Sequence, residues 1–260
     1  MKEVKNTNFL LKPPNFICDK ELKNVPNPFP YKQAFNLVIV GKPGSGKSSL
    51  AVSLITGKKK GEMVYRKKFN HILIMCPQGS LNSLKKDPFE SIDFEDIYHS
   101  FDLTNLYDIY SKIESWADED ENTLIYIDDL ASELKTGGKE LETLYKKIAY
   151  NRRHLRTSII NCVQRFNSIP KGIRQMTTDL IFFKCSKNEN IIMYDELLDI
   201  PKDKYLKLCQ FCFRNKHDTI TVNLNENKYY RNFNEIQGFI NDNEIFVCTR
   251  YGTGTNDVWK

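Results

Sequence analysis

The residues Phe35–Ser49, FNLVIVGKPGSGKSS, constrain the fold of this chain more than any other stretch. They predict a short apolar strand that ends in a glycine-rich loop and leads into a helix. Gly41, Gly46, Lys47 and Ser48 fill the fixed positions of the pattern G-x-x-x-x-G-K-[ST]. Because glycine has no Cβ, backbone N–H groups can curl around phosphate oxygens at the start of the helix. The sequence therefore predicts a nucleotide site.

Each position of this loop, the Walker A motif, carries an expected role. We expect Lys47 to reach the β- and γ-phosphates of ATP and the Ser48 hydroxyl to bind Mg²⁺. Replacing Lys47 with Ala is predicted to abolish ATP binding or hydrolysis. The expected nucleotide-binding set is Gly41, Lys42, Pro43, Gly44, Ser45, Gly46, Lys47, Ser48 and Ser49.

The composition indicates a globular chain that works inside a cell. Its 260 residues are 40% hydrophobic, which suffices for one large domain or one domain with appendages. No apolar run approaches the roughly 20 residues of a membrane span, and the first residues lack the apolar core of a signal peptide. The seven cysteines are scattered, so we expect reduced thiols. Cys209, Cys212 and His217 have spacing suggestive of zinc, but a structural site needs a fourth ligand.

The net charge of +5 is unevenly distributed along the chain. Acidic side chains dominate residues 87–121, whereas basic side chains dominate residues 135–174 and recur in Lys58–Lys68. Such runs are most often solvated faces, but basic segments beside a nucleotide site also suit a phosphate backbone.

The order of apolar segments predicts three parts: a proline-rich extended arm at 1–34, a nucleotide-binding core at 35–185 and a helical and hairpin extension at 186–260. Alternating strands and helices imply a mostly parallel sheet flanked by helices, an α/β fold. The expected core strands are 35–40, 71–76, 123–127, 158–163 and 179–183, with helices following the loop and at 103–116 and 139–154. In the extension we expect helices at 190–198 and 202–213 and a hairpin of 219–224 with 228–233.

Two carboxylates follow the apolar strand Thr123–Ile127, as in a Walker B motif. Asp128 is expected to share Mg²⁺ with Ser48, because a carboxylate at this strand end can hold the ion that bridges the phosphates. Asp129 is expected to deprotonate the attacking water as a general base. Its side chain is shorter than the glutamate that many related ATPases carry at this position.

The additional strands predict the P-loop NTPase class that has an extra strand, the RecA-like or ASCE class. Gln164 follows the strand at 158–163 and is a candidate sensor of the γ-phosphate. The alternative is an amide that merely caps the end of the strand.

Three segments are similar to the packaging ATPases of large DNA viruses of the poxvirus type and of virophages, within the HerA/FtsK superfamily. They are VIVGKPGSGKSS, IYIDDL and NRRHLRTSIINCVQRFNSIPKGIRQMTTDLIFFK, and the resemblance spans roughly Phe35–Lys184. It implies a ring-forming ATPase, a hexamer or pentamer, that pumps double-stranded DNA into a viral capsid at a portal vertex. It also implies a location in the virion or in a viral factory of the host cytoplasm.

The resemblance transfers to individual residues. Arg153 and His154 match an Arg-His pair of the family, Gln164 matches its sensor, and Arg174 matches an arginine after isoleucine. Either Arg153 or Arg174 could act as an arginine finger that supplies charge to the transferring phosphoryl group of a neighbouring subunit; the alternative is an ordinary surface ion pair.

Contact with DNA is expected just after the Walker B strand. Lys135 and Lys139 flank a loop with two glycines, and lysines with backbone amides suffice for contacts to a phosphate backbone that do not depend on sequence. Two other functions use the same loop: a small-molecule kinase, and a nucleotide-switched DNA-binding module that does not translocate. The paired aspartates and the downstream glutamine argue against the kinase.

Overall fold

The computed structural model describes residues 20–57, 64–78, 89–90, 96–129, 133–134, 137–237 and 247–248. Among them is a ten-stranded sheet with the strand order β10-β9-β8-β7-β6-β1-β5-β4-β2-β3. The parallel part comprises β1 (Asn36–Val40), β2 (His71–Met75), β3 (Ile97–Tyr98), β4 (Thr123–Asp128), β5 (Thr157–Val163) and β6 (Asp179–Phe183). The P-loop strand β1 therefore lies between β5 and β6, and β5 separates it from the Walker B strand β4. This order confirms the additional-strand class.

The chain after β6 continues the same sheet with the opposite strand direction. Its strands are β7 (Thr219–Asn223), β8 (Lys228–Arg231), β9 (Asn234–Gln237) and β10 (Val247–Cys248). β7 pairs with β6 in antiparallel register, from Asp179 opposite Asn223 to Phe183 opposite Thr219. β7 and β8 form the hairpin that the sequence predicted. The C-terminal segment is thus hydrogen-bonded to the nucleotide-binding core.

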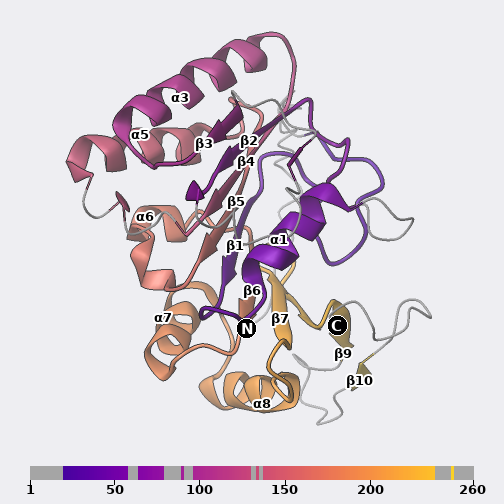
Figure 1. The fold of residues 1–260 in the computed structure, drawn as a ribbon. Coiled ribbons are helices and arrows are strands. Elements are labelled where there is room, and N and C mark those ends of the chain that lie inside the picture. Colours follow the sequence, from indigo (N-terminus) through magenta and orange to yellow (C-terminus); the bar gives the residue numbers. More distant parts are fainter. Residues whose placement is uncertain are drawn as a thin grey trace, which may run out of the picture.

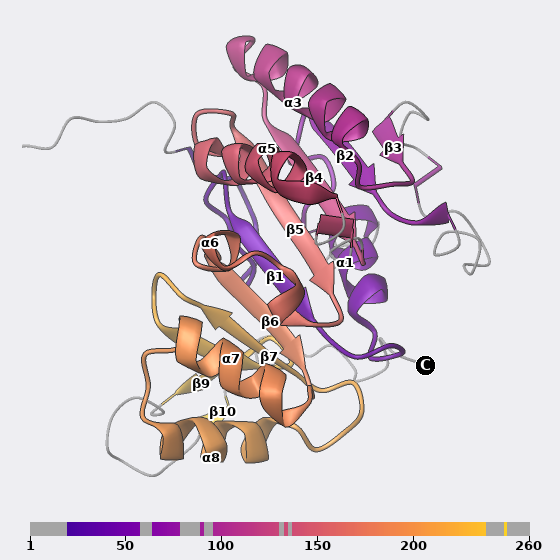
Figure 2. The same ribbon diagram turned by 90° about the vertical axis from the view of Figure 1, so that its left-hand side faces the viewer.

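Helices cover both faces of the sheet (Figures 1 and 2). One face is covered by α1 (Lys47–Thr56). The other is covered by α3 (Leu103–Asp118), α5 (Gly138–Asn151), α6 (Lys171–Arg174), α7 (Lys187–Leu197) and α8 (Lys202–Cys212), with a short 3₁₀ turn, η2 (Phe166–Ser168), between β5 and α6. None of the helices among the described residues is long and apolar enough to span a membrane.

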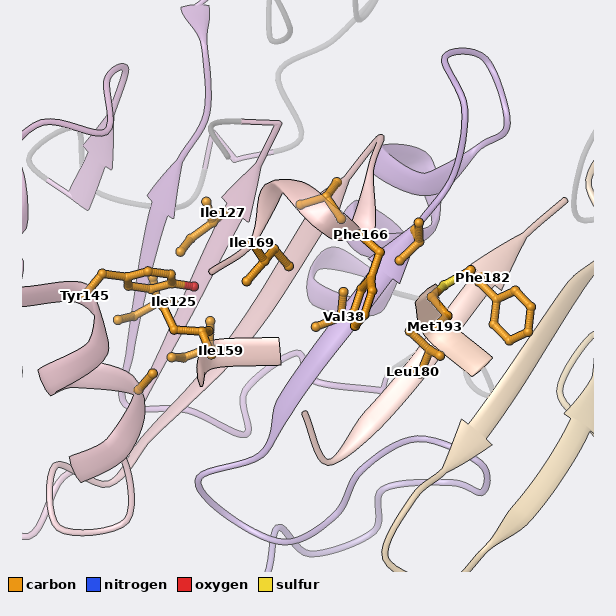
Figure 3. Packing of buried hydrophobic residues seen from close by; sticks show 14 of the residues in the cluster. Val38, Ile125, Ile127, Tyr145, Ile159, Phe166, Ile169, Leu180, Phe182 and Met193 are labelled. Carbon is orange, nitrogen blue, oxygen red and sulfur yellow. The ribbon is translucent and has the colours of Figure 1, made fainter. Parts of the chain in front are cut away.

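The side chains of β1 show why two layers of helices are needed. Val38 and Val40 join the core cluster beneath α3 to α8, whereas Leu37 and Ile39 join the cluster beneath α1. Successive residues of a strand point to opposite faces, so an entirely apolar strand must be covered on both sides. Figure 3 shows the first of these clusters, in which Phe166 and Met193 lie above the strands.

Most element boundaries lie within three residues of those predicted from sequence. α7 begins at Lys187, before the predicted start, because the Ser186 side chain accepts a hydrogen bond from Glu189 N and caps the helix. α5 ends at Asn151, before the predicted end, and a turn leads into β5. The two-residue strand β3 and the strand β9 were not predicted, because both are too short to show a period.

Part of the predicted N-terminal arm falls within the described residues. Leu22 N donates to Tyr31 O at 2.6 Å, so this segment folds back on itself. Phe29 packs against Phe233 with ring centroids 5.0 Å apart, and the Tyr65 hydroxyl donates to Pro30 O at 3.1 Å. Residues 20–34 therefore lie against the core.

Candidate functional site

The P-loop connects the carboxyl end of β1 to the first turn of α1. Gly46 has φ 104°, a left-handed conformation that residues with a Cβ rarely adopt. At Gly41, an added Cβ would lie 2.3 Å from the Ser45 Oγ and 3.0 Å from the Phe183 ring, so a neighbouring side chain would have to move. The backbone conformation therefore favours glycine at Gly46, whereas Gly41 leaves room for the neighbouring side chains.

The two expected magnesium ligands lie next to each other. The Ser48 hydroxyl donates a hydrogen bond to Asp128 Oδ1 at 3.1 Å and so joins α1 to the tip of β4. A hydroxyl and a carboxylate are oxygen ligands of the kind that Mg²⁺ prefers, and Mg²⁺ sites commonly use one or two such ligands with phosphates and waters. The described residues contain no cluster of three or more His, Cys, Asp or Glu side chains that could hold a metal without a nucleotide.

Burial and charge oppose each other at Asp128. Removal of this carboxylate from water raises its pKa, and the neighbouring Asp129 charge acts in the same direction. The Ser48 hydrogen bond and the positive charge of Lys47 act in the opposite direction without cancelling the rise. Lys47 is itself buried at the start of α1. The site thus holds a desolvated carboxylate beside a buried ammonium group.

The tips of β4 and β5 bring the expected base and sensor together. Asp129 N donates to Cys162 O at 2.9 Å, and Asp129 adopts φ 55°, a left-handed conformation that aspartate tolerates better than most residues. The Gln164 amide donates a hydrogen bond to Asp129 Oδ2. Gln164 therefore contacts the second acidic residue of the Walker B strand.

Arg174 lies in a different environment from the one that a finger requires. Its guanidinium is buried and forms a two-pronged pair with Glu196, with Nε to Oε2 at 2.7 Å and Nη2 to Oε1 at 2.6 Å. Its Nη1 also donates to Asn167 Oδ1 at 2.8 Å and to Ile169 O at 3.0 Å. All these partners belong to the same chain, so the geometry disfavours Arg174 as the finger. The side chain instead ties α6 and α7 to the loop that follows Gln164.

Arg153 and His154 lie at the opposite ends of the parallel strands from the P-loop. They lie in the turn between α5 and β5, and both are exposed. β5 runs parallel to β1, so the start of β5 lies at the amino ends of the strands, whereas the end of β1, where the P-loop begins, lies at their carboxyl ends. Neither residue can therefore serve the P-loop of its own chain.

Of the two expected DNA contacts, the structure describes Lys139, which is exposed in the first turn of α5. It lines a groove between α5 and the η2–α6 segment together with Lys171. Lys135 lies outside the described residues, as do Lys58, Lys59 and Lys60 of the other basic run.

One residue of the site had no predicted role there. His217 Nδ1 donates a hydrogen bond to the carbonyl oxygen of Ser45 at 2.8 Å, across 172 positions of sequence. In the sequence His217 appeared only as a weak zinc candidate with Cys209 and Cys212, yet Cys212 is buried in the core cluster of α8. No local pattern connects His217 to the P-loop, because the contact depends on the pairing of β7 with β6.

Comparison with known proteins identifies the family. A family model described as Poxvirus A32 protein matches residues 30–243. This chain belongs to the Poxvirus A32 protein family. The match includes the P-loop, the Walker B aspartates and Gln164, and extends through most of the C-terminal segment. It confirms the predicted relationship to poxvirus-type packaging ATPases. No curated protein sequence matches the chain.

Solved structures support the same fold for this member of the Poxvirus A32 protein family. The DNA-packaging ATPase B204 of Sulfolobus Turreted Icosahedral Virus is 13% identical, with 76% of this chain and 97% of that chain covered and a TM-score of 0.55. The genome packaging NTPase B204 of Sulfolobus turreted icosahedral virus 2, in complex with ATP-gammaS, is also 13% identical, with 76% and 96% covered and a TM-score of 0.56. At this identity the likeness shows the fold.

Proposed function

We propose that this chain is an ATP-driven translocase that packages double-stranded DNA into a viral capsid. The observation that carries the proposal is the hydrogen bond from Ser48 to Asp128, which joins the P-loop to the Walker B strand across the intervening β5. The Poxvirus A32 family and the fold of the B204 packaging ATPases support the biological setting.

The P-loop residues bind and orient the triphosphate. Backbone N–H groups of the loop face the phosphates at the N-terminus of α1, where the helix dipole favours negative charge. Lys47 neutralises the β- and γ-phosphates, while Ser48 and Asp128 would hold Mg²⁺. Mg²⁺ held there would offset the negative charge that develops on the transferring phosphoryl group.

Asp129 and Gln164 act on the attacking water. Asp129 accepts the proton of the water as its oxygen attacks the γ-phosphorus, and ADP leaves with the bridging oxygen. The Gln164 hydrogen bond fixes the direction of the Asp129 carboxylate. The Gln164 amide follows β5 and contacts the Asp129 carboxylate. Loss of the γ-phosphate can therefore change the position of Gln164 and of the loop that follows it.

Completion of the site by a neighbouring subunit is part of the proposal. Arg153 is our candidate finger, because it is exposed and lies at the opposite ends of the strands from the P-loop of its own chain, so it could serve only the site of an adjacent chain. The finger would stabilise charge on the transferring phosphoryl group. This arrangement requires a ring, a hexamer or a pentamer, in which Arg153→Ala keeps ATP binding and loses turnover. Mixing that variant with Lys47→Ala should restore part of the turnover; absence of any restoration would remove Arg153 from the proposal.

Contact with DNA is assigned to Lys135 and Lys139, which follow the Walker B strand. The exposure of Lys139 and its groove with Lys171 support this assignment, since contacts to phosphates need only accessible positive charge. The partners that follow from packaging are duplex DNA and a capsid or portal vertex, in the virion or a viral factory.

The deciding experiment measures ATP hydrolysis with and without linear duplex DNA, together with the mass of the ATP-bound assembly. A ring-sized mass and stimulation by DNA are expected, and Lys47→Ala should abolish both binding and hydrolysis. A monomer indifferent to DNA would overturn the translocase and point to a small-molecule kinase. A ring that binds DNA but does not displace a bound strand or a protein roadblock in one direction would point to a nucleotide-switched DNA-binding module.

A further inference from the structure

The turn between α8 and β7 places an imidazole against the P-loop. His217 Nδ1 lies 2.8 Å from Ser45 O, and it lies 3.6 Å from the point where a Cβ on Gly46 would be. A carbonyl oxygen can only accept, so Nδ1 must carry the proton in this contact. The imidazole therefore touches the peptide unit that joins Ser45 to Gly46.

The position of His217 is determined by its neighbour. Asp218 is buried and accepts hydrogen bonds from the backbone N–H groups of Arg214 at 2.9 Å and Asn215 at 2.7 Å. It also accepts one from Asn232 Nδ2 at 2.7 Å, while Asn232 Oδ1 accepts from Thr219 N at 2.8 Å. These hydrogen bonds connect the turn to the β7–β8 hairpin and so hold the backbone of His217 in place.

The geometry of a peptide bond gives this contact a consequence for phosphate binding. The carbonyl of Ser45 and the N–H of Gly46 belong to one planar unit and point in opposite directions. When His217 holds the Ser45 carbonyl toward itself, the Gly46 N–H is directed to the other side of the peptide, where we place the phosphate oxygens that P-loop amides bind. Donation to the carbonyl also polarises the peptide and strengthens its N–H as a donor.

We propose that His217 is a positioning residue that holds the Ser45–Gly46 peptide in its phosphate-binding orientation. The C-terminal part of the sheet thereby contributes to the nucleotide site of its own chain. The inference rests on the proposed nucleotide site, but it concerns a residue outside the Walker motifs and outside the parallel strands of the core.

The test uses the full chain and measures the affinity for ADP and ATP with Mg²⁺ by calorimetry, beside the steady-state constants. His217→Ala and His217→Phe should weaken nucleotide binding about two- to fivefold, the effect of losing one partly exposed hydrogen bond. KM should rise while kcat stays close to that of the parent. The melting temperature without nucleotide should not change, which separates positioning from a structural role.

Two matched variants sharpen the test. His217→Asn should recover most of the affinity, because the amide nitrogen of asparagine is the same number of bonds from Cα as Nδ1 of histidine. His217→Gln should recover less, because the amide nitrogen of glutamine lies one bond farther from Cα, as Nε2 of histidine does. Lys216→Ala, at the adjacent exposed position, should bind like the parent. Equal affinities of the parent and His217→Ala, or no recovery in His217→Asn, would overturn the role of His217. A parent chain that binds no nucleotide would instead refute the nucleotide site itself.

Discussion

Gln164, at the tip of β5, donates a side-chain hydrogen bond to the carboxylate of Asp129, which follows β4. If this pair orients the attacking water, Asp129→Asn should lower kcat by about 10²–10⁴-fold, the usual contribution of a general base. ATP affinity should remain, because phosphate binding depends on the P-loop. Gln164→Ala should lower kcat less.

The pair can be distinguished from two independent residues by a double-mutant cycle in single-turnover hydrolysis. The double variant should be hardly slower than Asp129→Asn, since Gln164 acts through the carboxylate. Strictly additive effects, or a normal kcat for Asp129→Asn, would contradict this assignment.

Arg174 is expected to support the loop after Gln164 from within its own chain. Arg174→Ala leaves the mostly buried Glu196 carboxylate without its partner and removes the contacts to Asn167 and Ile169. We expect a loss of about 3 kcal/mol in the free energy of unfolding, measured by urea denaturation. Arg174→Lys should recover little, because an ammonium group cannot reproduce the two-pronged geometry.

If Arg174 were the arginine finger, mixing two inactive variants would give a different result. Mixing Arg174→Ala with Lys47→Ala should restore no turnover, in contrast to the restoration expected for Arg153→Ala. Restored turnover with unchanged stability would show that Arg174 does reach a neighbouring site.

Asp179 should make the stability of the protein depend on pH. Its carboxyl begins β6, is 3% exposed, and has a pKa raised to about 7, chiefly by burial and to a smaller extent by the charge of Glu226, against a hydrogen bond from Thr178. The folded state therefore holds the proton more tightly than the unfolded chain, in which the pKa is about 3.8. The contribution of Asp179 is fully present below about pH 4 and is lost as the pH rises toward 7.

Asp179→Asn removes this dependence and keeps the side-chain shape. At pH 8 it should exceed the parent in free energy of unfolding by about 2–4 kcal/mol, and the difference should vanish below about pH 4. Asp195→Asn, an exposed position on α7, should follow the parent at every pH. A difference between Asp179→Asn and the parent that does not vary with pH would show that the buried carboxyl does not titrate as argued.

Neutralising Lys135 and Lys139 with glutamine should reduce the stimulation of hydrolysis by DNA. Each phosphate contact contributes about −0.9 to the slope of log affinity against log salt concentration, so losing two should flatten that slope by about 2. Hydrolysis without DNA should not change, and Lys202→Gln on α8 is the matched control. Unchanged stimulation would move the DNA contact to the stretch Lys58–Lys68.

The features that sequence predicted correctly are local ones. The P-loop could be recognised because its glycines meet a backbone requirement within the loop itself, as the conformation of Gly46 shows. The ends of β4 and β5 were visible because an apolar run stops at a polar residue, which placed Asp128 and Gln164 at strand tips. The family resemblance then related these tips to one site. The Ser48–Asp128 contact joins the P-loop to the tip of β4, and the Gln164–Asp129 contact joins the tips of β5 and β4.

The tertiary structure decided which distant residues meet. The apolar pattern of a strand indicates which of its faces are buried, but not which strand lies beside it, so the pairing of β7 with β6 could not be read from the chain. That pairing brings His217 to Ser45, and the packing of α7 on the η2 loop brings Glu196 to Arg174. By itself the sequence predicted a P-loop at Gly41–Ser48, paired aspartates at the end of a buried strand and the class of sheet. The fold decided that Arg174 pairs with Glu196 and that His217 contacts Ser45, because contacts between distant segments depend on register and packing that no local pattern records.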